Sequence, residues 1–158
     1  MLTHDEIARR IPHQGRMCLL ARVVSWGEER IECEASSHRD GANPLRAHGR
    51  LGIACGIEYA AQAMAVHGAL LAQAAAEGGA VARPRAGYLA GLRGVQFHTR
   101  RLDDVEGPLE VHAERLLGDG NGMVYGFALQ AGGRTLLQGR ATVILDALPV
   151  PPGAEAAA

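Results

Sequence analysis

The sequence predicts an α+β domain in which one curved antiparallel sheet surrounds a single long helix. An alanine-rich, largely apolar segment over residues 53–76 predicts the helix, and Gly78-Gly79 predicts its end. Segments typical of strands come before and after this helix in the chain. A helix of about 24 residues is roughly 36 Å long. Strands from both flanks are therefore needed to enclose it, which defines the α+β arrangement.

The segment before the long helix contains a short helix, two strands and a loop. Thr3 and Glu6 have the spacing of a capping box, and the short helix is expected to stop before Pro12. Apolar residues then alternate with polar ones, which is typical of half-buried strands. The predicted elements are strands over 17–25 and 30–37, a turn over 26–29, and a loop over 38–50 that is rich in Gly, Pro, Asn and Asp.

After the long helix the pattern is that of β-structure almost to the end. Turn clusters at Gly118–Gly122 and Gly132-Gly133 separate the predicted strands, which are 86–98, 108–117, 122–130 and 134–146. The Pro- and Ala-rich end of the chain predicts a disordered tail over 149–158. Residues 1–148 then form a single domain.

Composition narrows the possible functions. The chain has 158 residues, 47% apolar and 21% charged, as expected for one globular domain. A net charge of −1 gives no general attraction to nucleic acid. Polar residues interrupt the apolar run 51–76, so we expect no membrane span, and the N-terminus lacks the apolar region of a signal peptide. Three cysteines without a paired spacing predict reduced thiols in a cytoplasmic protein: Cys18, Cys33 and Cys55.

Glu58 is the residue that most requires an explanation. It lies near the start of a helix that is otherwise built to be buried, and an unpaired ionised carboxylate costs several kcal/mol to bury. Gln62 follows one turn later on the same face. His48 precedes Glu58 by ten residues in the loop. A carboxylate, an amide and a histidine in this order indicate acid–base chemistry at the start of the helix.

Three segments resemble FabZ-type 3-hydroxyacyl-ACP dehydratases of the hotdog superfamily. Glu58-Tyr-Ala-Ala-Gln62-Ala resembles the E-x-x-A-Q-x segment of that family, and Ile11-Pro12-His13 with Met17–Leu20 resembles its L-P-H-x-x-P-[FM]-L-L start. Arg85-Ala-Gly-Tyr-Leu-Ala-Gly-Leu resembles the strand after the helix in a smaller branch associated with aryl-polyene and related pigment gene clusters. The resemblance spans residues 11–145 in the correct order. It implies the hotdog fold.

The resemblance also implies a reaction, namely dehydration of 3-hydroxyacyl-ACP to trans-2-enoyl-ACP in fatty-acid- or polyene-type synthesis. On this basis Glu58 is expected to be the acid, with Gln62 orienting its carboxyl group or a water beside it. The base is assigned to His48 from its proximity to Glu58 in the sequence. The amides of the first helical turn, from Gly52 to Gly56, are expected to stabilise the thioester oxygen. The loop departs from the family's G-H-F-P-G pattern, since here it is Ala-His-Gly-Arg-Leu. The substrate arrives on phosphopantetheine, so we expect no cofactor, and no His, Cys or carboxylate spacing suggests a metal.

The expected partners are an acyl carrier protein or CoA thioester and a second hotdog subunit. Carrier proteins are acidic, and five arginines without an intervening acid are expected to form a docking patch: Arg83, Arg85, Arg93, Arg100 and Arg101. In the resembling enzymes the histidine and glutamate of one site come from different subunits of a dimer. We therefore expect a homodimer or heterodimer whose sheets join edge to edge.

Three other histidines have different expected roles. His13 is expected to pack, His38 is the substitute base, and His67 falls about 180° around the helix from Glu58, which indicates a core or interface position.

Two alternative functions remain open. A non-catalytic or half-site subunit that binds acyl chains in a heterodimer is one alternative. A hotdog thioesterase, with its carboxylate aimed at water, is the other.

Overall fold

The computed structural model describes residues 1–79, 87–119 and 121–145. Its strands form one antiparallel seven-stranded sheet in the order β1-β2-β3-β5-β6-β7-β4. In chain order the strands are β1 (Leu2–Thr3), β2 (Arg22–Trp26), β3 (Arg30–Ala35), β4 (Gly87–Phe97), β5 (Leu109–Gly118), β6 (Gly122–Ala131) and β7 (Arg134–Leu145). The helices are α1 (His4–Ala8) and α2 (Gly56–Glu77), with short 3-10 turns at Gly15–Met17, Ser37–Arg39 and Ile53–Cys55.

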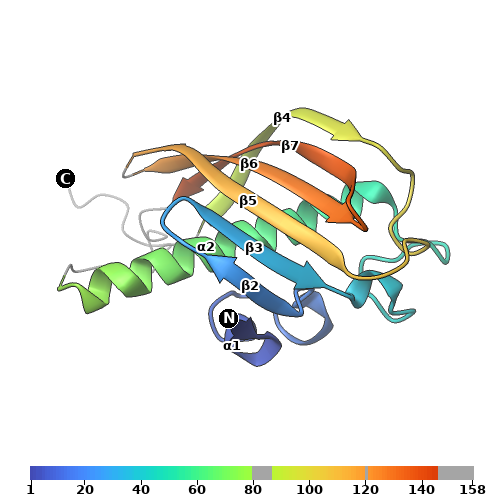
Figure 1. Ribbon diagram of the computed structural model, residues 1–158, viewed down its shortest axis with the longest axis horizontal. Coiled ribbons are helices and arrows are strands. Elements are labelled where there is room, and N and C mark those ends of the chain that lie inside the picture. Colours follow the sequence, from blue (N-terminus) through green and yellow to red (C-terminus); the bar gives the residue numbers. More distant parts are fainter. Residues whose placement is uncertain (80–86, 120, 146–158) are drawn as a thin grey trace, which may run out of the picture.

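Helix α2 crosses the hollow side of the curved sheet (Figure 1). This arrangement confirms the predicted hotdog fold. Apolar side chains of neighbouring strands form continuous rows against the helix, because Cβ atoms at paired positions point to the same face. One such row joins Cys33, Val111, Leu129 and Leu137, which are all buried.

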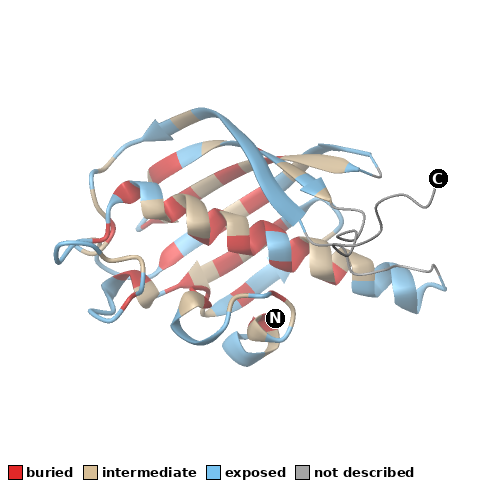
Figure 2. Cartoon of the chain, turned by 180° about the vertical axis from the view of Figure 1, so that it is seen from behind, coloured by how far each residue is buried: buried red, intermediate tan, exposed pale blue. Residues whose placement is uncertain are grey.

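Most predicted elements are confirmed, with three corrections. Residues 17–21 are not part of a strand, because the chain makes a 3-10 turn and an irregular segment there before β2. The α-helix begins at Gly56 rather than residue 53, after the 3-10 turn. It is also not enclosed along its whole length, since residues 73–77 are exposed and extend past the sheet (Figure 2).

The predicted capping box and the predicted glycine turn are confirmed. Thr3 and Glu6 form the complete capping box of α1. Gly132 and Gly133 have φ values of 55° and 76° and make the two-residue turn between β6 and β7. Positive φ at both positions suits glycine and matches the twist of the flanking strands. The predicted tail over 149–158 lies outside the described residues.

Strand β4 forms one edge of the sheet and has little cover on either face. Ten of its eleven residues are exposed, with only Val95 half-buried (Figure 2). Its apolar side chains include Tyr88, which is 55% exposed, and Leu89 and Leu92, which are each 42% exposed. An exposed apolar edge strand is a template for pairing with another chain. The helix packs instead against β3, β5 and β6.

Within the described ranges, no helix is long and apolar enough to cross a membrane.

Candidate functional site

Glu58 lies in the first turn of α2, where the positive end of the helix dipole favours a carboxylate. Its side chain is 33% exposed in the single chain. The expectation that Glu58 lies on an enclosed part of the helix is therefore wrong for one chain alone. Glu58 lies at a boundary between core and solvent, where a substrate has access to it.

Gln62 connects Glu58 to the N-terminal segment. Its Nε2 donates to Oε1 of Glu58 at 3.1 Å and to the carbonyl oxygen of Met17 at 2.7 Å. Its Oε1 accepts from the backbone N–H of Leu19 at 2.9 Å. Gln62 is fully buried, and its three bonds leave its amide no freedom to rotate. It is therefore placed to orient the carboxyl group of Glu58, and their i, i+4 spacing accounts for the contact.

His13 is the histidine that the structure brings to Glu58. Its Nε2 lies 3.0 Å from Oε1 of Glu58, within ion-pairing distance. The segment that carries it is braced by Gln14, whose side chain donates to the carbonyls of Ala8 and Ile11. Sequence reasoning expected His13 only to pack. Its place in the family-like Ile11-Pro12-His13 start was the available signal, but the sequence did not show which helix residue this start contacts.

His48 lies elsewhere, at the exposed tip of a tight turn between Ala47 and Arg50. Its φ of 52° is in the left-handed region, which non-glycine residues seldom occupy. Arg46 braces this turn by donating to the carbonyl of Gly49. Among the described residues, no hydrogen bond or ion pair joins His48 to Glu58. Within one chain, the structure does not bring the two predicted catalytic residues together.

Some of the backbone N–H groups between Gly52 and Gly56 are already hydrogen-bonded within the chain, so not all of them are the free donors that the sequence predicted. The N–H of Gly56 is directed to carbonyls of the preceding 3-10 turn, and the N–H of Cys55 donates to Gly52. Gly56 is instead a packing residue. A Cβ built there would lie 2.3 Å from Cδ2 of Leu137 and 3.0 Å from Cδ2 of Leu129. Gly52 is exposed and pairs as an isolated bridge with Arg101.

A buried polar cluster joins α2 to the loop that follows β3. The hydroxyl of Tyr59 lies 2.9 Å from the hydroxyl of Ser37 and accepts from the amide of Asn43 at 3.1 Å. Ser37 also donates to the carbonyl of Leu19. Burial raises the pKa of Tyr59, so its hydroxyl stays protonated near neutral pH. The cluster fixes the loop against the helix next to Glu58.

His38, the substitute base in the sequence analysis, is buried beside this cluster. Its Nε2 lies 3.2 Å from the carbonyl oxygen of Val105, and its Nδ1 is buried without a partner in the described part of the chain. Burial lowers its pKa. Among the described residues no hydrogen bond or ion pair joins His38 to Glu58, so its geometry does not support a role as base in one chain.

Three of the five arginines of the predicted docking patch are described, and their surroundings differ. Arg83 and Arg85 lie outside the described residues. Arg101 is ion-paired with Asp103, whose side chain is only 5% exposed and also accepts from the N–H of Leu51. Because Arg101 donates to it, the pKa of Asp103 lies well below its usual range. Arg93 is exposed on β4 opposite Arg140 of β7, so two like charges face each other at the sheet edge. Arg100 is also exposed.

His67 is a core histidine, as its helical position predicted. Its Nδ1 lies 2.9 Å from the hydroxyl of Tyr125 and its Nε2 lies 2.8 Å from the carbonyl oxygen of Gly27. A neutral ring that donates from Nε2 and accepts at Nδ1 satisfies both contacts. His67 ties the middle of α2 to the sheet and takes no part in the candidate site.

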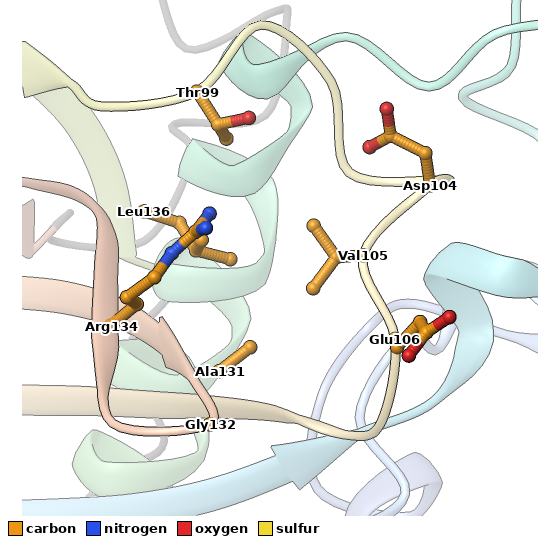
Figure 3. Close-up of a pocket in the computed structure, with 8 residues that line it drawn as sticks. All are labelled: Thr99, Asp104, Val105, Glu106, Ala131, Gly132, Arg134 and Leu136. Atoms are coloured by element: carbon orange, nitrogen blue, oxygen red, sulfur yellow. The ribbon is translucent and has the colours of Figure 1, made fainter.

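A separate open pocket of about 360 Å³ lies between the segment after β4 and the β6–β7 turn (Figure 3). Thr99, Asp104, Glu106 and Arg134 give it a polar lining beside Val105 and Leu136. It contains none of His13, Glu58 or Gln62. We place the candidate site at Glu58 because a histidine and a buried amide both contact its carboxyl group there.

In the described part of the chain, His, Cys, Asp and Glu side chains form no group of three that could hold a metal ion.

Comparison with known proteins identifies the family. The sequence model of the ApeP-like family, described as ApeP dehydratase, matches residues 5–148. The chain belongs to the ApeP-like dehydratase family. This membership accounts for the match between the Glu58–Gln62 segment and dehydratases. Among curated protein sequences, none matches the chain significantly.

Solved structures support the fold of this family member. The dehydratase heterocomplex ApeI:P from Xenorhabdus doucetiae matches with a TM-score of 0.75 and 24% identity, over 92% of each chain. A thioesterase family protein from Silicibacter pomeroyi matches with a TM-score of 0.61 and 17% identity, over 90% of this chain and 97% of its own. A thioesterase from Haemophilus influenzae has a TM-score of 0.59 and 11% identity, over 92% of each chain. Because these sequence identities are low, the three matches show a shared fold and nothing more.

Proposed function

We propose that this dehydratase acts on 3-hydroxyacyl thioesters of an acyl carrier protein and forms trans-2-enoyl thioesters in polyene-type synthesis. The observation that carries the proposal is the arrangement around Glu58. Gln62 and His13 both contact its Oε1, and no hydrogen bond or ion pair to Oε2 occurs among the described residues. One oxygen is held by the protein while the other is available to substrate.

The reaction needs one proton removed and one delivered. A base takes the proton from C2, the electron pair of that C–H bond forms the C2=C3 double bond, and the C3–O bond breaks. Glu58 delivers a proton to the departing hydroxyl, which leaves as water. No oxidant or reductant is required. The acid role requires Glu58 to carry its proton on Oε2, the oxygen that its contacts with Gln62 and His13 do not use.

We assign the base to His48 of a second subunit. The turn that carries His48 is exposed and braced, and it stays away from Glu58 of its own chain. A histidine presented in this way is suited to act on a neighbouring subunit. The exposed apolar edge of β4 offers the surface for that subunit, because an edge strand pairs with another edge through its free backbone groups.

The second subunit is a further copy of this chain or another hotdog protein. A solved relative of the same fold is described as the heterocomplex ApeI:P, which supports a heterodimer. On such an assembly Arg93 and Arg100 of the predicted patch are exposed, as is Arg140 opposite Arg93, and they can attract an acidic carrier protein. Arg101, a third member of the predicted patch, is already paired with Asp103.

The test is dehydration of a 3-hydroxyacyl-ACP, followed by mass spectrometry for loss of water. Wild type, His48→Ala and Glu58→Gln are compared, alone and with candidate partner subunits. Loss of turnover in both variants, with fold and assembly retained, supports both assignments. Loss with Glu58→Gln alone contradicts the role of His48. Thiol release from an acyl thioester without a 3-hydroxyl group indicates a thioesterase, and no turnover in any combination indicates a non-catalytic subunit.

A further inference from the structure

We propose that His13 is a positioning residue that holds the catalytic carboxyl group of Glu58 from within the same chain. This inference rests on the proposed function of Glu58. In this role His13 contacts neither the substrate nor the reacting carbon atoms. Its effect passes through Oε1 of Glu58, 3.0 Å from its Nε2.

The direction of the contact follows from the two ring nitrogens. Nδ1 of His13 is buried and has no partner among the described residues. A proton on Nδ1 would be a buried N–H without an acceptor, which costs free energy. A proton on Nε2 faces Oε1 of Glu58 instead. The neutral Nε2–H form is therefore the one that suits this site.

His13 and Gln62 complement each other because they reach Glu58 from different parts of the fold. Gln62 comes from the helix, one turn after Glu58, and is itself held by Met17 and Leu19. His13 comes from the segment before those residues. Two contacts on one oxygen restrict rotation about the last side-chain bond of Glu58. Oε2 is then presented in a constant direction, as positioning for proton transfer requires.

The first experiment compares the dehydration kinetics of wild type, His13→Ala and His13→Gln. The glutamine places an N–H donor near the position of Nε2 but does not titrate. We expect His13→Ala to lower kcat by about 10- to 100-fold with little change in KM, because misplacement of a catalytic group has effects of this size. We expect His13→Gln to recover most of the loss and to keep the wild-type pH profile. His4→Ala is the matched control, since His4 contacts the carbonyl of Leu20 in the same N-terminal region.

Three kinetic outcomes overturn the inference. If His13→Ala keeps wild-type kcat, His13 does not position Glu58. If neither variant at His13 turns over while both remain folded, His13 is itself the base. If His4→Ala loses as much kcat as His13→Ala, the effect comes from the N-terminal region as a whole.

A second measurement does not depend on turnover. Long-range 15N–1H NMR of the full chain reports which nitrogen of each neutral histidine carries the proton. We expect the Nε2–H form for His13, and a change in its signals in Glu58→Ala that His4 does not show. An Nδ1–H form overturns the inference. If wild type shows the expected NMR signature but no dehydration, the proposed function fails while the His13–Glu58 contact stands.

Discussion

Gln62 of helix α2 accepts a hydrogen bond from the backbone N–H of Leu19 at 2.9 Å, although 42 residues separate them in the chain. The same side chain donates to Met17 and Glu58. Two family-like segments, the Ile11–Leu20 start and the Glu58–Gln62 helix turn, therefore meet at one amide. The N-terminal segment is part of the site and not only a cap on the sheet.

Replacement of Gln62 tests this junction. Gln62→Ala leaves the buried N–H of Leu19 without its acceptor and frees Glu58. We expect a loss of about 2–3 kcal/mol in the free energy of unfolding, together with reduced dehydration. Urea unfolding measures the first and the mass-spectrometric assay the second. Gln73→Ala on the exposed end of the same helix is the control, and we expect a change within about 0.5 kcal/mol. Equal losses in the two variants would contradict the junction.

Two glycines of α2 give a paired prediction on packing. Gly56→Ala forces a Cβ against the buried side chains of Leu137 and Leu129, so we expect destabilisation by about 1–3 kcal/mol. Gly68→Ala meets nothing within 4 Å, and we expect stabilisation by up to about 1 kcal/mol from higher helix propensity. Thermal unfolding followed by circular dichroism separates the two. A stabilised Gly56→Ala would show that the contact with β7 is loose.

The buried histidines predict a loss of stability in weak acid. Burial lowers the pKa of His67, and the charge of Arg115 acts in the same direction, although the contact with Gly27 opposes them. As pH falls below about 6.5, the unfolded chain takes up a proton more readily than the folded one. The free energy of unfolding is therefore expected to fall below this pH. The lowered pKa of His38 has the same sign.

Urea unfolding at about pH 8 and pH 5.5 measures this dependence. We expect His67→Gln to be less stable at the higher pH and to have a smaller difference between the two. His98→Gln, at an exposed position, is the control and keeps the wild-type difference. A wild-type stability that does not change between these pH values would contradict the prediction.

The edge strand β4 predicts how the subunits assemble. Leu92→Glu places a charge on an exposed apolar edge and is expected to weaken the proposed dimer. Light scattering after size exclusion, with the partner subunit where one is required, measures the assembly. Leu117→Glu is the control, since Leu117 is 70% exposed on β5 away from that edge. A wild-type monomer under all conditions, or equal effects of both variants, would count against pairing through β4.

The contacts of Asp103 are expected to keep the turn that carries His48 rigid. It pairs with Arg101 and accepts from the N–H of Leu51, and Arg46 lies 3.6 Å away. We expect Asp103→Asn to lower the free energy of unfolding by about 2 kcal/mol and to speed amide hydrogen exchange near residues 46–51. Asp104→Asn, whose side chain is 59% exposed, should change neither. Unchanged exchange in Asp103→Asn would show that the turn is held by other contacts.

The sequence by itself determined the features that depend on nearby residues. Four features follow from local backbone preference and periodicity, namely the capping box at Thr3, the stop at Gly78, the Gly132-Gly133 turn and the alternation along β3. The pairing of Glu58 with Gln62 belongs to the same class, because an i, i+4 spacing places both on one helical face.

Only the tertiary structure decided which distant residues meet at Glu58. His13 reaches it through a chain reversal after α1, whereas His48, ten residues from Glu58 in sequence, is turned into solvent by a braced turn. The exposed edge of β4 likewise follows from the strand order and not from its apolar composition, which suits a buried strand equally well. The physical reason is that contacts between distant segments depend on how the whole chain packs, and that packing leaves no signature in local periodicity.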